Sequence, residues 1–288
     1  MTNFAERLQY AAKMLDGREI SKVRCSIGSN VFFGWGDDVI HKLSNDGTHH
    51  DSEWMVWLSF TDWRITHLGE YVLGVGDPHE IIKERLPLMI GKRLKSLEVI
   101  SPLMDIEIAF DDGYKITTFI HSFEEDQWTL FFPDSTWLDV PFETEQQRQR
   151  VKKISKYFKF STPFQKLDTV IDDMMIKKTF YDDERGFSLY FDKHLSLIID
   201  MFAWRIVKGP DLYLDRLESL EELVQKLKAL EGQELKRVET ANDLADTRFI
   251  IGDEYILQTF ACSKEEGHEW GIYRQDEPIF IGRAALSE

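Results

Sequence analysis

Residues 45–52 hold the most polar cluster of side chains that could do chemistry, with His49, His50 and Asp51 in succession. Imidazole nitrogens and carboxylate oxygens bind metal ions and transfer protons. A zinc site, however, needs about four converging ligands, and neighbouring side chains on a strand point to opposite faces. The spacing therefore favours a polar hairpin loop over a metal centre, and we expect no cofactor.

Adjacent carboxylates are a second candidate, because glycoside hydrolysis and metal-dependent catalysis use pairs of acids. The pairs are Asp37-Asp38, Asp111-Asp112, Glu124-Glu125 and Asp182-Asp183. Catalysis needs carboxylates that converge in a cleft, whereas neighbouring acids in a turn face solvent. We therefore predict no enzymatic activity and assign Asp37, Asp38, Asp111 and Asp112 to partner binding.

The tripeptide Trp-Arg-Ile occurs twice and places Arg64 and Arg205 between apolar residues. Arginine can hold a phosphate or carboxylate through two parallel hydrogen bonds. Strand alternation favours the simpler interpretation that Trp and Ile are buried while the arginines pair with acidic neighbours on the opposite face. The loop at residues 74–79 precedes a predicted helix but lacks the lysine of a phosphate-binding loop, and no common nucleotide-binding, hydrolase or zinc-protease motif occurs.

The composition describes a folded, strongly acidic chain. Of its 288 residues 43% are hydrophobic and 13% aromatic, and its formal net charge is −16. A negative field repels nucleic-acid phosphates and attracts basic proteins, although an acidic surface also serves solubility alone. Two cysteines, an N-terminus without an apolar leader and the lack of a long apolar run predict a cytoplasmic chain without disulfides or membrane segments.

An internal repeat organises the chain. Trp63-Arg64-Ile65 recurs as Trp204-Arg205-Ile206, an offset of 141 residues. The same offset relates Gly91 to Gly232, Leu94 to Leu235, Asp105 to Asp246, Tyr114 to Tyr255, Thr118 to Thr259 and Phe119 to Phe260, and an offset of 142 relates Trp128 to Trp270. We predict a tandem duplication with domains at residues 1–141 and 142–288. A fainter similarity between residues 16–23 and 90–97, each followed by an acidic turn, suggests a hairpin unit that is used about four times, twice in each domain.

Local patterns predict the elements of each domain. Residues 105–110 and 114–120 alternate around Asp111-Asp112-Gly113, which is a hairpin signal, and strands follow at 128–132 and 137–140. Matching strands are expected at 248–251, 255–260, 270–273 and 279–281. A helix capped by Asp77 should end at Gly91, and its counterpart should start near Ser219 and end at Gly232. Further helices are expected at residues 3–15 and, as the connector, at 144–158. We predict an α+β fold in which each domain is a mostly antiparallel sheet of about five to seven strands with a helix packed on one face.

Residues 54–140 resemble a small bacterial domain of unknown function. In that domain a Trp-Arg-(Ile/Leu) strand leads to a Gly-Ser-x-Asp helix start, a Gly-x-x-(Ile/Leu) strand, an acidic-turn hairpin and a final Trp strand. Here Val75 replaces the serine, and in the second half the helix-start turn is absent and the acidic turn is Gly252-Asp253-Glu254. Such domains are similar to immunity proteins encoded beside polymorphic toxins, and the resemblance implies an inhibitor but transfers no functional residue.

We therefore predict a non-enzymatic protein that binds and inhibits or neutralises a macromolecular partner, an immunity-type or anti-defence protein. The partner is expected to be a protein with a basic surface, with no direct contact to nucleic acid or membrane. Trp35, Trp54 and Trp57 are the predicted aromatic anchors, because exposed tryptophans dominate many interfaces. A small-ligand or nucleotide site in a cleft between the domains is the alternative.

Overall fold

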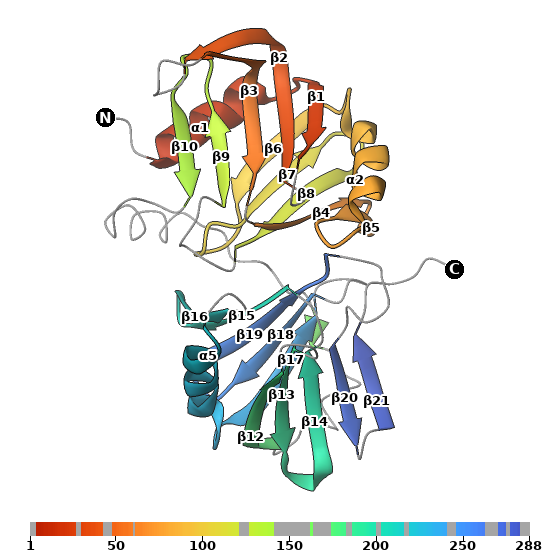
Figure 1. Ribbon diagram of the computed structural model, residues 1–288, viewed down its shortest axis with the longest axis vertical. Coiled ribbons are helices and arrows are strands. Elements are labelled where there is room, and N and C mark those ends of the chain that lie inside the picture. Colours follow the sequence, from red (N-terminus) through yellow and green to blue (C-terminus); the bar gives the residue numbers. More distant parts are fainter. Residues whose placement is uncertain are drawn as a thin grey trace. The chain divides into compact units, whose positions relative to one another are not determined.

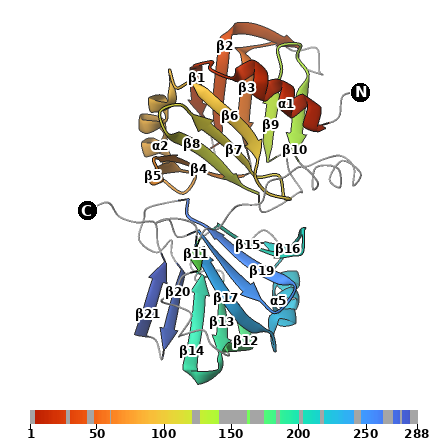
Figure 2. The same cartoon turned by 180° about the vertical axis from the view of Figure 1, so that it is seen from behind.

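The computed structural model describes residues 4–26, 30–42, 48–59, 61–120, 127–140, 162–163, 174–182, 186–199, 203–215, 219–240, 246–262, 270–274 and 277–282. The chain divides into two compact units, residues 1–68 with 72–157 and residues 69–71 with 158–288. The predicted boundary near residue 142 and the connector helix at 144–158 lie outside the described residues. Figures 1 and 2 show the chain from opposite sides.

Unit 1 contains two five-stranded antiparallel sheets. The first has the order β1-β2-β3-β9-β10, and its strands are Ile20–Cys25, Val31–Lys42, Thr48–Leu58, Trp128–Phe131 and Trp137–Val140. The second has the order β5-β4-β8-β7-β6, and its strands are Glu70–Gly74, Asp62–His67, Tyr114–Phe119, Ile106–Phe110 and Leu94–Val99. In both views the two sheets form separate layers of this unit (Figures 1 and 2).

Helix α1 (Phe4–Leu15) lies against the first sheet of unit 1, where Phe4 contacts Trp128 and Tyr10 contacts Trp54. Helix α2 (His79–Arg85) continues into the 3₁₀ turn η2 (Leu86–Met89). Its apolar residues Ile82, Leu86 and Met89 belong to one buried cluster with residues of both sheets. The core of unit 1 therefore joins two sheets and two helices, and the expectation of a single sheet with one helix was too simple.

Unit 2 repeats the strand order of unit 1. The path β16-β15-β19-β18-β17 corresponds to β5-β4-β8-β7-β6, and β12-β13-β14-β20-β21 corresponds to β1-β2-β3-β9-β10. Here β12 also pairs with β17, which joins both halves into one continuous sheet. The elements are β11 (Thr162–Pro163), β12 (Met174–Asp182), β13 (Gly186–Phe191), η3 (Asp192–His194), β14 (Leu195–Ile199), β15 (Ala203–Lys208), β16 (Asp211–Asp215), α5 (Leu220–Leu227), η4 (Lys228–Leu230), β17 (Glu234–Thr240), β18 (Thr247–Ile251), β19 (Tyr255–Phe260), β20 (Trp270–Arg274) and β21 (Glu277–Gly282).

Several elements of the two units have the same bounds after a shift of 141 residues: β4 and β15, β5 and β16, β7 and β18, and β8 and β19. Two side-chain hydrogen bonds recur at the same shift. The buried carboxylate of Asp105 accepts from the backbone N–H of Ile120 at 2.6 Å, and that of Asp246 accepts from Ala261 at 2.9 Å. Thr118 and Thr259 likewise accept from the N–H groups of Ile106 and Thr247.

The mostly antiparallel sheets and the few helices confirm the α+β class. The predicted hairpin at residues 105–120 and its counterpart at 248–260 are strands β7, β8, β18 and β19. Gly91 and Gly232 end their helical segments at φ +82°, a conformation that favours glycine. One expectation was wrong: Asp37 and Asp38 lie inside strand β2, at a β-bulge between Trp35 and Asp38, instead of in a turn.

Candidate functional site

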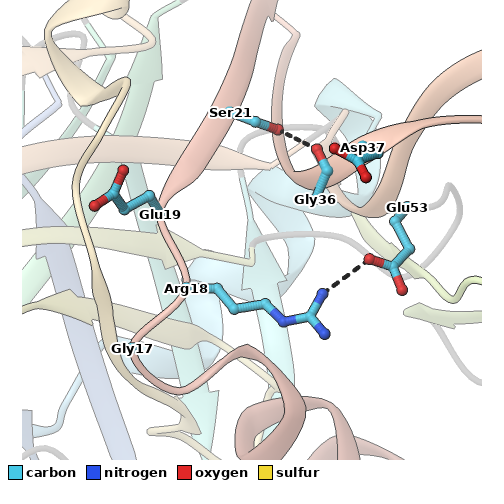
Figure 3. A pocket seen from close by; sticks show the side chains of 7 residues that line it. All are labelled: Gly17, Arg18, Glu19, Ser21, Gly36, Asp37 and Glu53. Carbon is cyan, nitrogen blue, oxygen red and sulfur yellow. Dashed lines mark hydrogen bonds and ion pairs between the residues drawn. The ribbon is translucent and has the colours of Figure 1, made fainter.

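An open depression of about 560 Å³ lies on unit 1 where strands β1, β2 and β3 meet the end of α1. It is lined by Gly17, Arg18, Glu19, Ser21, Gly36, Asp37 and Glu53. Three of these residues are carboxylates and one is a cation. Figure 3 shows Arg18 and Glu53 reaching towards each other, with Asp37 beside Gly36. Of the predicted partner-binding residues, only Asp37 belongs to the lining.

The bulge in β2 gives the depression its shape. Gly36 adopts φ +83°, and a Cβ atom at this position would come within 2.5 Å of the Glu53 carboxylate oxygen Oε2. Glycine therefore allows Glu53 of β3 to lie directly beside the bulge. The hydroxyl of Ser21 donates to the carbonyl of Gly36 at 2.8 Å, which ties β1 to the same place.

The charged side chains around the depression differ in whether they form ion pairs. Arg18 donates to Glu53 at 2.9 Å, with both side chains about one third exposed. Arg93, which lies just before β6 and forms an isolated β-bridge with Glu19, donates to the Glu19 carboxylate at 2.9 Å. Asp37 is exposed, and among the described residues it forms no ion pair. The depression therefore presents one uncompensated carboxylate and two ion pairs at the solvent boundary, which suits a positively charged ligand group.

Asp51 is part of a second charge cluster beside the depression. This carboxylate is 2% exposed, forms an ion pair with Arg24 and lies 3.5 Å from the ammonium of Lys22. Lys22 also contacts Asp38 at 3.1 Å. A buried carboxylate requires such compensation, so Asp51 has a structural partner set on strand β1. Asp51 lies in β3, not in the hairpin loop predicted from the sequence. The side chains of His49 and His50 lie outside the described part of the structure.

The acidic turn between β7 and β8 is connected to the depression through Arg93. The N–H of Asp111 donates to the carbonyl of Arg93 at 3.1 Å, and the Arg93 guanidinium holds Glu19. Asp112 accepts from Lys92 at 2.5 Å. Partial burial acts to raise the pKa of Asp112, but the hydrogen bond and charge of Lys92, together with backbone hydrogen bonds from Tyr114 and Asp112, outweigh burial and lower this pKa. The structure thus links two predicted acidic pairs that lie far apart in the sequence.

The tryptophan anchors require a correction. Trp35 and Trp54 are 0% and 1% exposed and belong to the core of unit 1, so they offer no surface to a partner. Trp57 is half-buried on the opposite face of β3 and stacks on Phe32, with ring centroids 5.3 Å apart and planes at 8°. Of the three predicted anchors, Trp57 alone keeps part of its ring at the surface.

The duplicated arginines are interior residues in both units. Arg64 is 5% exposed and Arg205 is 3% exposed. The Nε–H of Arg205 donates to the side-chain oxygen of Gln258 at 2.7 Å, so an amide is one of its partners where we expected an acid. In the same unit, burial lowers the pKa of Arg248; Glu239 opposes this shift, and Arg205 and Arg237 add to it.

The predicted cap of α2 also differs from the structure. Pro78 occupies the N-cap position, and the carboxylate of Asp77 accepts from the N–H of Gly74 at 2.8 Å inside the preceding loop. His79, the first residue of this helix, places Nδ1 3.5 Å from the sulfur of Cys25. Sequence spacing gave no signal for this pair, because 54 positions separate its members.

Among the described residues no group of three or more His, Cys, Asp or Glu side chains is arranged to hold a metal ion. No described helix is long and apolar enough to cross a membrane. Comparisons of the chain with protein-family models, with curated proteins and with solved structures gave no match.

Proposed function

We propose that this protein binds a basic segment of a macromolecular partner and thereby inhibits or neutralises it without catalysis. The observation that carries the proposal is the depression of unit 1, where Arg18 and Arg93 pair with Glu53 and Glu19 while Asp37 forms no ion pair with any described residue. The net charge of −16 would attract a basic partner over a long range, and the depression would then hold a lysine or arginine side chain.

The lining supplies the acceptors that such a side chain needs. Asp37 offers a carboxylate, and the Gly36 carbonyl and the Ser21 hydroxyl lie next to it. The Arg18–Glu53 pair lies at the solvent boundary and can exchange partners at little cost, because ion pairs near the surface contribute about 0.2–1 kcal/mol. Asp111, at the turn linked through Arg93, adds a second acceptor for a longer basic segment.

We also propose that the two units arose by tandem duplication. The repeated strand order, the elements related by a shift of 141 residues, and the paired hydrogen bonds of Asp105 and Asp246 support this origin. In this proposal the second copy preserves the scaffold, whereas the acidic depression belongs to unit 1. The resemblance to immunity domains favours an inhibitor among possible binding proteins.

The proposal is tested with two double variants of equal net charge. Asp37→Asn with Asp111→Asn removes carboxylates at the depression and its linked turn, and Glu84→Gln with Glu221→Gln removes exposed carboxylates on α2 and α5. Binding of an immobilised dodecapeptide of alternating lysine and glycine is measured by interferometry. We expect the first variant to weaken binding about threefold or more relative to the second, from about 0.2–1 kcal/mol for each contact.

Equal weakening of both variants would contradict the proposal, because attraction would then follow net charge alone. A peptide of alternating glutamate and glycine serves as the negative probe. Added salt should reduce peptide binding in all variants, since exposed charges are screened beyond about 8–10 Å at physiological ionic strength.

A further inference from the structure

Cys25 and His79 form a thiol–imidazole pair outside the depression. Cys25 is the last residue of β1 and is half-buried, and its sulfur lies 3.5 Å from Nδ1 of His79. The sulfur also lies 3.7 Å from the carbonyl of Ser26.

The surroundings of the thiol explain its resting state. Burial raises the pKa of Cys25; the positive charge of Lys83 opposes this shift, and Glu80 adds to it. His79 and Lys83 are four residues apart on α2 and therefore lie on the same face of the helix. His79, Glu80 and Lys83, all on α2, are the titratable groups that the described structure places around the Cys25 sulfur. The thiol accordingly rests in its protonated form and needs a base before it can attack.

We propose that Cys25 is a reversible modification site that exchanges with small disulfides, with His79 as the base that accepts its proton. The Cys25 sulfur attacks one sulfur of the disulfide R–S–S–R, and its proton passes to Nδ1 of His79. A new S–S bond forms to Cys25 as the old one breaks, and the departing thiolate takes up a proton to leave as RSH. No electrons are gained or lost overall, and an added thiol reverses the step.

Cys262 provides an internal comparison. Cys262 is buried, at 5% exposure, whereas Cys25 is only half-buried, so solvent reaches the sulfur of Cys262 less readily. Reactivity of cysteines depends on access and on the ease of forming the thiolate. Cys25 should therefore react with a small disulfide, whereas Cys262 in the same molecule should not.

The full-length protein is treated with bis(2-hydroxyethyl) disulfide, a neutral probe that the acidic chain does not repel. Peptide mass mapping measures the rate of mixed-disulfide formation at each cysteine between about pH 6 and 10. At about pH 7 we expect Cys25 to react in the wild type and the rate to fall at least about tenfold in His79→Ala and His79→Asn, because general bases typically contribute about 10²–10⁴-fold. At alkaline pH the three rates should converge, since the thiolate then forms without a base.

Three results would overturn the proposal: no adduct at Cys25, equal rates at neutral pH in all three proteins, or a rate deficit that persists unchanged at alkaline pH. The last result would show that His79 affects access and not proton transfer. Circular dichroism of the variants shows whether they are folded, and the asparagine variant retains a polar side chain of similar reach. Dithiothreitol should restore the unmodified mass.

Discussion

Gly34 shows how one missing side chain brings three strands of unit 1 together. It lies in β2, and a Cβ atom there would collide with the hydroxyl of Ser52 and approach the Ser52 Cβ to 2.6 Å. The Lys22 Cβ atom would lie at 3.5 Å. Ser52 directly follows Asp51, whose carboxylate is held by Lys22 and Arg24. Glycine at this position therefore permits the close approach of β2 and β3 beside the buried carboxylate.

Gly34→Ala should destabilise the protein by about 1–3 kcal/mol, because a methyl group added to a packed site forces neighbouring atoms to move. The free energy of unfolding in urea measures the effect. Combining Gly34→Ala with Ser52→Gly removes the colliding atoms, so the two changes together should cost less than the sum of the single changes. Simple additivity would show that the strands adjust without strain at this point.

At the scale of elements, the starts of the two helices α2 and α5 contrast. Helix α5 starts after Ser219, as predicted, and the Ser219 hydroxyl accepts from the N–H of Glu222 and donates to the Glu222 carboxylate at 2.7 Å. Helix α2 instead starts after Pro78 without a side-chain cap, and Asp77 stabilises the loop before it. A capping-type side chain thus stabilises the helix start in unit 2 and the loop before the helix in unit 1.

Ser219→Ala should reduce stability by about 1 kcal/mol, within the range of about 0.5–2 kcal/mol for the loss of a capping side chain. Hydrogen exchange at the first turn of α5 should increase, because the N–H of Glu222 loses its acceptor. Ser219→Thr keeps the hydroxyl and should retain most of the stability. If the alanine variant matched the wild type in both measurements, the cap would contribute nothing to α5.

At the scale of the whole molecule, two separate buried clusters hold the chain. One contains described residues between Leu8 and Leu138, and the other contains residues between Met174 and Ile272. Ile65 and Ile206 occupy equivalent positions in these clusters, and both are 0% exposed. Separate cores predict that a defect in one unit leaves the packing of the other intact.

Ile65→Ala and Ile206→Ala should each cost about 2–5 kcal/mol, from lost burial and the cavity left behind. Native-state hydrogen exchange, read peptide by peptide, should show faster exchange in the mutated unit only. Faster exchange throughout the chain from either substitution would mean that the two units unfold as one. Ile65 and Ile206 are matched in residue type, in burial and in their position within the strand, so each variant serves as the control for the other.

Local chemistry determined much of the architecture. The repeat, the hairpins around residues 111–113 and 252–254, the start of α5 and the helix ends at Gly91 and Gly232 depend on neighbouring residues, so they could be predicted from the sequence. Other features of the architecture depend on pairing with neighbouring strands. Asp37 and Asp38 became part of a bulge and not a turn because β3 continues alongside β2 on both sides of Gly36.

The acidic charge, the α+β class and the repeated pattern of elements could be read from the amino-acid sequence, because each follows from composition or from residues close along the chain. Tertiary structure alone decided which tryptophans are buried, since both faces of β2 and β3 carry apolar residues and alternation cannot show which face meets the core. It also decided the depression and the Cys25–His79 pair. Their members come from separate segments that only strand pairing and helix packing bring within contact distance.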